Sequence, residues 1–392
     1  MKVIKSASKP QSNGIHIMIY TEAFYPQIGG GENYSADLAT TLVSFGFKVT
    51  VLTPVQSKKL DKFSFSVARL SHPLKLYGFN LNFLEILSYI RRYRPSLFHI
   101  SGPTPIDFLL LLICRITGVP VIVTFHGKFN TAVGRLVLYI QGRMFYSSAR
   151  SVLVQSEREM EYLRNLGLDS HSLKLFYFNG VDREKYSCDK CGGKKAYDQT
   201  NLAFRFVFVG GLTKSRPYKG IEKLMQIFRS LYNGTDGENI FLTVIGEGDL
   251  LPKMRLLMND YDRISFAGRL SHDDLLHELC TSDMLILPSV SEGEGFGKVV
   301  LEALSCGVPV MVSKFAGISR LIEKYRCGLI FDPHDIGESL KKIIFISRNR
   351  TMLQEYINNS EEMMKSEGLD LISTTKKTLD VYKEIVNAEV LR

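Results

Sequence analysis

Residues 283–307 read DMLILPSVSEGEGFGKVVLEALSCG, and this stretch decides how the second half of the chain folds. DMLILPS is a short apolar run that is typical of a buried strand, and KVVLEALSCG has helical spacing that ends at a glycine. Between them, Gly293, Gly295 and Gly297 are too evenly spaced for a protein-kinase loop. Lys298 lacks the following Ser or Thr of a Walker loop. The stretch predicts a strand, a glycine turn and a helix whose N-terminus attracts an anion, with an ordinary turn as the alternative.

Glu302 lies in the second turn of this expected helix, among apolar residues. A carboxylate in such a place is costly unless it is paired, and two vicinal hydroxyls are a good partner because a carboxylate has two acceptor oxygens. A phosphate at the glycine turn and a diol at Glu302 would together describe a nucleotide ribose. The alternative interpretation of Glu302 is an exposed helix residue.

Short apolar runs alternate with amphipathic segments along most of the chain, which indicates parallel sheets flanked by helices. With 392 residues, 45% hydrophobic and 23% charged, the chain is expected to form two soluble domains. The expected strands of the first series are residues 14–20, 47–53, 97–100, 119–125, 151–156 and 173–178. Those of the second series are residues 204–210, 240–246, 263–268, 283–289, 308–313 and 328–332.

A polar stretch without periodicity, residues 182–201, separates the two series. We therefore expect a first domain over residues 1–180 and a second over residues 181–366. Residues 367–392 form a C-terminal helix that is expected to pack back on the first domain. In doubly wound sheets ligands bind beyond the carboxyl ends of the strands, so the glycine-rich loops there are the candidate sites.

Basic charge is concentrated in the first half of the chain. Residues 1–180 hold 20 Lys and Arg against 10 Asp and Glu, whereas residues 181–392 hold 29 against 30. Basic residues interleaved with aromatic ones suit a surface that faces anionic lipid headgroups, and a solvated basic face is the alternative. No nucleic-acid-binding module is recognisable. Without a signal peptide or an uninterrupted apolar span, we expect a cytoplasmic protein, peripheral on the inner face of the membrane.

The six cysteines predict no metal site. Cys114, Cys280, Cys306 and Cys327 stand alone, as reduced core cysteines do. Cys188 and Cys191 form a C-x-x-C pair, which supplies two ligands where a structural zinc needs four, and no second pair or H-x-x-x-H completes it. An ordinary loop is the expected role of this pair, with zinc and redox chemistry as the alternatives.

The motif EGFGKVVLE resembles the E-x7-E signature of retaining glycosyltransferases of family 4, with Glu294 and Glu302 as its two acids. Further resemblances extend over about residues 15–335: FYPQIGGGENY to P-x-x-GG-x-E, VTFHG to T-x-H-G, NGVD to NGVD, and AGISRLI to GGIPELI. The resemblance implies an α/β protein of GT-B fold, in which two Rossmann-like, doubly wound domains face a central cleft.

The resemblance also assigns roles in the second domain. Glu302 would hold the ribose hydroxyls, and Glu294 would lie near the sugar and the reaction centre. Backbone groups of Gly295, Phe296, Gly297 and Lys298 would bind sugar or phosphate. These donor-binding roles agree with the argument from the burial of a carboxylate.

Fixed cations stabilise a leaving diphosphate, and the family uses an Arg and a Lys in a G-R-L…K-G pattern. Lys219 matches the lysine, but Gly211 stands where the arginine is usual. Lys214 or Arg216 could replace that arginine, with Lys214 preferred; a plain basic loop is the alternative.

In the first domain, Gly30 and Gly31 fall in the segment whose backbone lies against the diphosphate. His126 would contact the transferred sugar, as a positioning group and not as a nucleophile. By itself, His126 after a strand would be read as a hydrogen-bonded structural histidine. His99 is expected to be structural, because Ser101 replaces the second His of the family pattern.

The implied activity is transfer of a hexose-type sugar from a nucleoside-diphosphate sugar to an acceptor hydroxyl, with retention of configuration and without a metal or other cofactor. The basic first domain suggests a lipid-linked or polysaccharide acceptor. A nucleotide-sugar epimerase and a non-catalytic nucleotide-sugar binding protein are the alternatives. Binding of nucleic acid is not expected.

Overall fold

The computed structural model describes the chain over residues 14–26, 30–57, 62–71, 75–76, 79–80, 83–104, 106–126, 146–168, 172–191, 203–235 and 237–390. It divides into two compact units. Unit 1 is Met1–Asn179 with Leu371–Arg392, and unit 2 is Gly180–Asp370. The expected boundaries were 180/181 and 366/367; the structure places the second one four residues later, because Asp370 still pairs with Val181 as a β-bridge.

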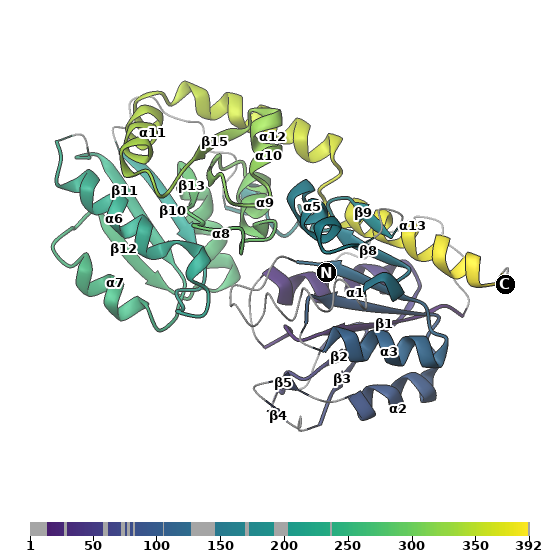
Figure 1. Cartoon of the computed structure of the whole chain (residues 1–392). Coiled ribbons are helices and arrows are strands. Elements are labelled where there is room, and N and C mark those ends of the chain that lie inside the picture. The colour runs from purple at the N-terminus through teal and green to yellow at the C-terminus, as the bar shows by residue number, and fades with distance from the viewer. Residues whose placement is uncertain are drawn as a thin grey trace. The chain divides into compact units, whose positions relative to one another are not determined.

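Unit 1 is built on a seven-stranded parallel sheet with the order β3-β2-β1-β6-β7-β8-β9 (Figure 1). Its strands are β1 (His16–Thr21), β2 (Lys48–Thr53), β3 (Ser66–Arg69), β6 (Leu97–Gly102), β7 (Val121–Phe125), β8 (Ser151–Val154) and β9 (Leu173–Leu175). The strand order reverses between β1 and β6, so a crevice is expected at their carboxyl ends. A two-stranded antiparallel ribbon, β4 (Lys75–Leu76) with β5 (Phe79–Asn80), stands apart from the sheet.

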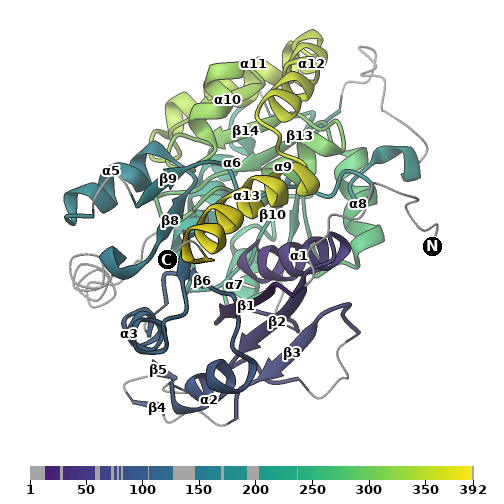
Figure 2. The same cartoon turned by 90° about the vertical axis from the view of Figure 1, so that its right-hand side faces the viewer.

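The helices of unit 1 pack on both faces of this sheet, which is why every residue of β1 and β6 is buried. They are α1 (Gly30–Ser44), α2 (Phe83–Tyr93), α3 (Asp107–Thr117), α5 (Glu157–Asn165), the short η1 (Tyr146–Ser148) and α13 (Leu371–Val390). Helix α13, the last of the chain, lies beside α1 (Figure 2) and buries Leu379 and Tyr382 in the same core as Ile17.

Unit 2 is built on a six-stranded parallel sheet with the order β12-β11-β10-β13-β14-β15. Its strands are β10 (Phe204–Val209), β11 (Ile240–Ile245), β12 (Ile264–Gly268), β13 (Met284–Leu287), β14 (Val310–Ser313) and β15 (Gly328–Phe331). Its helices are η2 (Cys188–Cys191), η3 (Pro217–Lys219), α6 (Ile221–Tyr232), α7 (Leu251–Leu257), α8 (His272–Thr281), α9 (Lys298–Ser305), α10 (Ser319–Tyr325), α11 (Ile336–Arg348) and α12 (Thr351–Ser366). The order reverses between β10 and β13, which directs attention to the loops after these two strands.

The two Rossmann-like units confirm the predicted fold class, and each expected strand overlaps an observed one. Strand β3 was missed, since it is half exposed along its length and shows no alternation of apolar and polar residues.

A buried ion pair lies at the edge of the core of unit 2. Arg350 Nη1 lies 3.1 Å from Asp283 Oδ1, and Asp283 also accepts the backbone N–H of Arg205. Within the described ranges, no helix is both long and apolar enough to cross a membrane.

Candidate donor and acceptor sites

The glycine motif lies between β13 and α9, as predicted. Gly297 is the N-cap residue of α9, with a φ of 85° that favours glycine. A glycine offers no side chain to cap the helix, so the first N–H groups of α9 point to a place where an anion is stabilised. Phe296 is buried beneath this turn with 3% of its surface exposed.

An ion pair joins this motif to the loop after β10. Lys219 Nζ lies 2.6 Å from Glu294 Oε2, and the two side chains are only 15% and 9% exposed. Burial is the largest single influence and lowers the pKa of Lys219, but Glu294 and Tyr218 together outweigh it, and the pKa is raised above its ordinary value. Lys219 is therefore a fixed, buried cation, which is the kind of group that stabilises a leaving diphosphate.

Close backbone contacts hold the loops around this ion pair. A Cβ at Gly220 would lie 1.9 Å from the carbonyl oxygen of Pro288, and one at Gly317 would lie 1.9 Å from that of Gly295. Gly317 N–H donates to the same Gly295 oxygen at 2.8 Å. Only glycine allows these approaches, so the loops after β10, β13 and β14 form one frame.

The guanidinium of Arg216 approaches Gly211, the position at which the family pattern has an arginine. Its Nη1 is 3.9 Å from the position that a Cβ of Gly211 would occupy. Its charge also lowers the pKa of Lys219, as one of the weaker influences on that group. Lys214, which the sequence favoured, contacts the neighbouring loop through its backbone N–H, which donates to Asp249 Oδ1 at 2.9 Å.

Glu302 is buried on α9 with 7% of its surface exposed, which excludes the exposed helix residue as its interpretation. Lys298, four residues earlier on the same helix face, is 9% exposed. The motif thus carries three buried charged residues: Glu294 in the loop before α9, and Lys298 and Glu302 on the helix.

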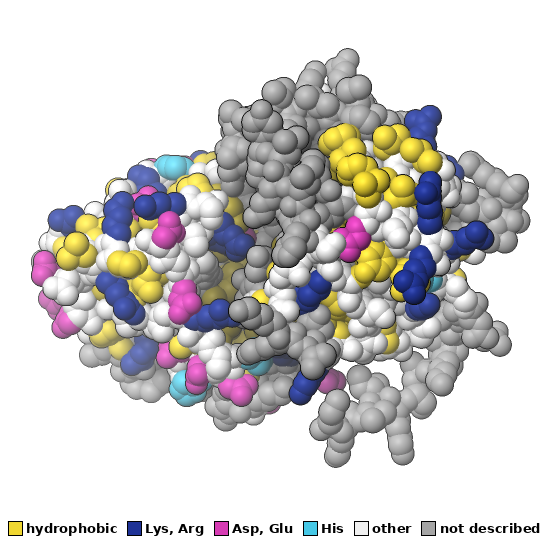
Figure 3. All heavy atoms as spheres, turned by 90° about the horizontal axis from the view of Figure 1, so that it is seen from below, with side chains coloured by type: hydrophobic (Ala, Val, Ile, Leu, Met, Phe, Trp, Pro, Cys, Tyr) yellow, Lys and Arg dark blue, Asp and Glu magenta, His cyan; other side chains and the backbone are white. Residues whose placement is uncertain are grey.

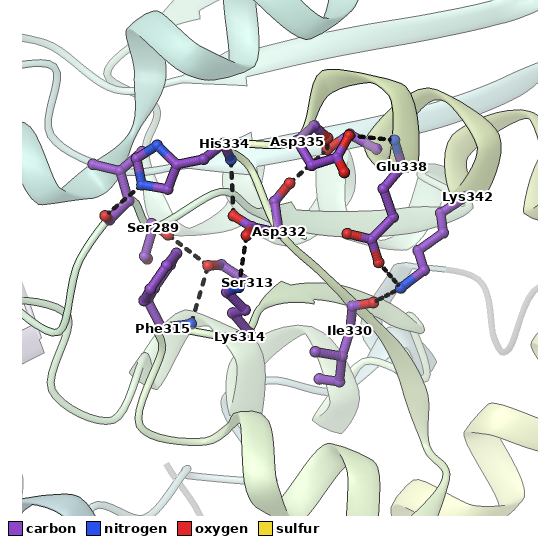
Figure 4. Close-up of polar contacts among 12 residues, drawn as sticks. Ser289, Ser313, Lys314, Phe315, Ile330, Asp332, His334, Asp335, Glu338 and Lys342 are labelled. Atoms are coloured by element: carbon purple, nitrogen blue, oxygen red, sulfur yellow. Dashed lines mark hydrogen bonds and ion pairs between the residues drawn. The ribbon is translucent and has the colours of Figure 1, made fainter.

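Further side-chain contacts between these loops could not be predicted from the sequence. Figure 4 shows Ser313, whose Oγ donates to the carbonyl oxygen of Ser289 at 2.5 Å and accepts the Phe315 N–H at 3.2 Å. His334 Nε2 lies 2.9 Å from the carbonyl oxygen of Val290. These side chains connect the loops after β13, β14 and β15 by hydrogen bonds to backbone oxygens. No local sequence pattern predicts such contacts.

In unit 1, His126 follows β7 and is held on several sides. Its Nε2 lies 3.0 Å from Ser101 Oγ and 3.2 Å from Thr124 Oγ1, and its ring packs edge-on against Tyr34 and Phe178. Burial lowers the pKa of His126 to about 3. His126 is therefore a neutral imidazole at physiological pH. Ser101, the departure from the family pattern, is its hydrogen-bond partner.

His99 lies deeper in unit 1 and is structural, as expected. It is fully buried between Thr124 and Tyr382 of α13, and burial with the nearby His126 lowers its pKa to about 3. Gly30 and Gly31 open helix α1, whereas residues 27–29 before them lie outside the described residues.

Two acids near the ends of β1 and β6, the half-buried Glu22 and the buried Asp107, were missed by sequence reasoning. Burial raises the pKa of Glu22 to about 7, with the Asp107 charge as a second cause. Asp107 accepts from Tyr146 Oη at 2.7 Å, and burial raises its pKa to about 6. The signal available in the sequence was only that both acids follow strands.

Two glycosyltransferase families match this chain. "Glycosyltransferase Family 4" matches residues 28–185, and "Glycosyl transferases group 1" matches residues 202–363. The protein therefore belongs to the glycosyltransferases, and its two units have the Rossmann-like folds of the GT-B class.

Individual relatives are distant. Sulfoquinovosyl transferase SQD2 of Arabidopsis thaliana is 24% identical over 290 residues, which are 69% of this chain and 52% of that protein. A GDP-mannose-dependent alpha-(1-6)-phosphatidylinositol monomannoside mannosyltransferase of Mycobacterium tuberculosis is 26% identical over 183 residues, 44% of this chain and 47% of the relative. The chain thus spans about half the length of each. The structure of Anabaena HepE with UDP-glucose has a TM-score of 0.75 at 16% identity, covering 94% of this chain and all of that one.

The two buried histidines make stability depend on pH. The unfolded chain takes up a proton at each His below its ordinary pKa of about 6.5, but the folded chain does so only near 3. Each His therefore makes its full contribution to the free energy of unfolding above about pH 6.5. That contribution falls by about 1.4 kcal/mol per pH unit as the pH falls toward 3. Glu22 and Asp107 act in the opposite direction, because their folded pKa values are raised.

We predict that His99→Asn removes one histidine's share of this slope. Urea unfolding followed by circular dichroism should show about 2 kcal/mol less loss in the variant than in the parent between pH 6 and 4.5. His277→Asn, at an exposed position of α8, is the matched control and should keep the parent slope. Equal slopes in His99→Asn and the parent would contradict the lowered pKa.

Proposed function

We propose that this glycosyltransferase moves a sugar from a nucleoside-diphosphate sugar to an acceptor hydroxyl with retention of configuration. The observation that carries the proposal is the buried Lys219–Glu294 pair beside the uncapped N-terminus of α9. A fixed cation and an anion-binding helix end, held by adjacent loops, are suited to a diphosphate. The relatives support a nucleotide-sugar donor, since one is a GDP-mannose-dependent mannosyltransferase and a similar structure holds UDP-glucose.

In this mechanism unit 2 binds the donor. Backbone N–H groups of residues 295–298 bind phosphate or sugar, and the Glu302 carboxylate accepts from the ribose hydroxyls. Lys219 and Arg216 stabilise the charge that develops on the departing diphosphate, so a metal is not required there. Glu294 orients Lys219 and borders the sugar.

Unit 1 supplies neutral side chains and binds the acceptor. His126, with its lowered pKa, positions the transferred sugar by hydrogen bonding and does not serve as a cation. The backbone of Gly30 and Gly31 at the start of α1 approaches the diphosphate. The leaving phosphate oxygen then assists the incoming hydroxyl on the same face of the sugar, which gives retention without a protein nucleophile.

The donor should be identified first by screening nucleotide-sugars for thermal stabilisation, since only a bound species raises the unfolding temperature by mass action. Incubation with acceptor extracts then distinguishes the functions. Glycosylated product and released nucleoside diphosphate support transfer. An epimerised free donor would identify an epimerase, and binding without release would identify a binding protein.

Glu302→Ala is predicted to weaken donor binding by about 1–3 kcal/mol, or roughly 5- to 150-fold in Kd, because charged hydrogen bonds to the ribose are lost. Calorimetric titration with the donor measures this. Glu355→Ala, at an exposed position of α12, is the control and should bind as the parent does. An unchanged Kd in Glu302→Ala would remove the ribose assignment.

Arg216→Ala is predicted to lower kcat on the order of 10²-fold, whereas Lys214→Ala in the same loop should change it little. The reason is that the Arg216 guanidinium lies at the vacant side-chain position of Gly211. Steady-state kinetics at saturating donor separates kcat from binding. A larger loss in Lys214→Ala would assign the second cation to that lysine.

A lipid-linked or membrane-surface acceptor is part of the proposal. Exposed apolar residues of α2 and α3, Leu84, Leu112 and Ile116, accompany exposed Arg91 and Arg92. In the right-hand part of Figure 3, hydrophobic side chains lie beside Lys and Arg side chains. Such a surface suits the inner face of a membrane with anionic lipids.

The double variant Arg91→Ala/Arg92→Ala should bind phosphatidylserine vesicles about 30-fold more weakly, since each Arg contributes about 1 kcal/mol at such a surface. Co-sedimentation at moderate ionic strength measures binding. Arg229→Ala, exposed on α6 of unit 2, is the control. Equal sedimentation with neutral and anionic vesicles would remove the support for an anionic membrane surface.

A further inference from the structure

Three cysteine sulfurs meet in unit 2, far from one another in the sequence. Cys188 begins η2, Cys280 lies in the last turn of α8, and Cys306 is the C-cap residue of α9. Their Sγ atoms all lie within 4.8 Å of one another, and no other group of this kind occurs among the described residues. Cys188 and Cys306 are buried, and Cys280 is half-buried.

The expectation that Cys280 is a reduced, isolated cysteine was wrong. The structure joins it to Cys188 as a disulfide, with a Cα–Cα distance of 5.8 Å. Sequence spacing could not show this, because 92 residues separate the two. Cys114 and Cys327 are buried and reduced, as expected.

A disulfide explains two sulfurs, but it does not explain why Cys306 lies against both of them. A zinc ion would account for all three, because Zn–S bonds of about 2.3 Å place tetrahedral thiolate ligands about 3.8 Å apart. The three Sγ atoms lie within 4.8 Å of one another, and reduction of the disulfide would free Cys188 and Cys280 to take that spacing. A Cα–Cα distance of 5.8 Å between Cys188 and Cys280 fits two ligands of one ion as well as it fits a disulfide. A structural zinc site also takes a fourth ligand.

The sequence offers that fourth ligand. Cys191 follows Cys188 by three residues. C-x-x-C is a spacing at which two cysteines bind one zinc ion. Cys188, the first cysteine of this pair, meets two further cysteines in the fold.

The site would fix the segment that begins unit 2 to two helices. Polar and ring contacts of Tyr186 hold this segment against both helices. Ser305 Oγ donates to the Tyr186 carbonyl oxygen at 2.7 Å, and the Tyr186 ring packs edge-on against His272 of α8. A metal bridge at residues 188, 280 and 306 would reinforce the attachment of this segment to the ends of α8 and α9.

We propose that Cys188, Cys191, Cys280 and Cys306 of the reduced protein bind one structural zinc ion. Binding requires Cys188 and Cys280 as thiols, and it displaces the thiol protons. This departs from the expectation of a chain without metal. The zinc serves stability and not sugar transfer, so the proposal stands apart from the donor chemistry.

The test is the metal content of the full chain, purified with a reductant and without added metal. Plasma mass spectrometry should find about one zinc per chain in the parent and a loss of at least tenfold in Cys280→Ser and Cys306→Ser. Cys327→Ser is the matched control, since Cys327 is buried in the same unit with its Sγ 3.8 Å from the Ile322 carbonyl oxygen, and it should retain zinc.

The parent protein gives a second measurement in case a serine variant does not fold. A strong zinc chelator should lower the melting temperature, and added zinc should restore it. Cobalt(II) in place of zinc should give the visible bands of a tetrahedral thiolate complex. Absence of zinc from the parent purified with reductant would overturn the proposal. So would non-reducing peptide maps that show Cys188 and Cys280 still linked in that preparation. Stoichiometric iron in place of zinc would do so too.

Discussion

The contact between Lys219 and Glu294 is the interaction on which the candidate donor site depends. The two side chains come from loops that follow β10 and β13, and these loops meet because the sheet places those strands side by side. Loss of either partner would leave an uncompensated buried charge, which costs about 3–5 kcal/mol. Glu294 balances the charge of Lys219 in this structure, and in the proposed function a diphosphate would bring a second negative charge to the same cation.

The two units differ in the charged and neutral groups that they hold. Unit 2 holds charged groups in a frame of backbone contacts, in which Gly220 and Gly317 allow carbonyl oxygens to approach. Unit 1 holds neutral imidazoles, because burial lowers the pKa values of His99 and His126 to about 3. This division suits a transfer in which the charge develops on the leaving diphosphate and the sugar needs orientation by uncharged hydrogen-bonding groups.

The sequence was sufficient wherever a local pattern determines the structure. Strands such as β1 are buried on both faces, so they read as continuous apolar runs, and Gly297 marks the start of α9 as the only residue type that favours its φ. Contacts that depend on tertiary structure were out of reach. Ser313 and His334 act on backbone oxygens 24 and 44 residues away, and the choice between Lys214 and Arg216 depends on the conformation of one loop.

Helix α9 connects the donor motif to the cysteine cluster. Its N-terminus follows the glycine turn, Glu302 lies in its second turn, and its C-cap residue is Cys306, whose N–H donates to the Glu302 carbonyl oxygen at 3.2 Å. A helix of eight residues is too short to be stable by itself, so its position comes from tertiary contacts: the packing of its buried face, which includes Val300, Leu301 and Leu304, and the contacts at its two ends. The loop frame fixes one end. A zinc ion at Cys306 would fix the other, and the Glu302 carboxylate between them would keep its place whether or not a donor is bound.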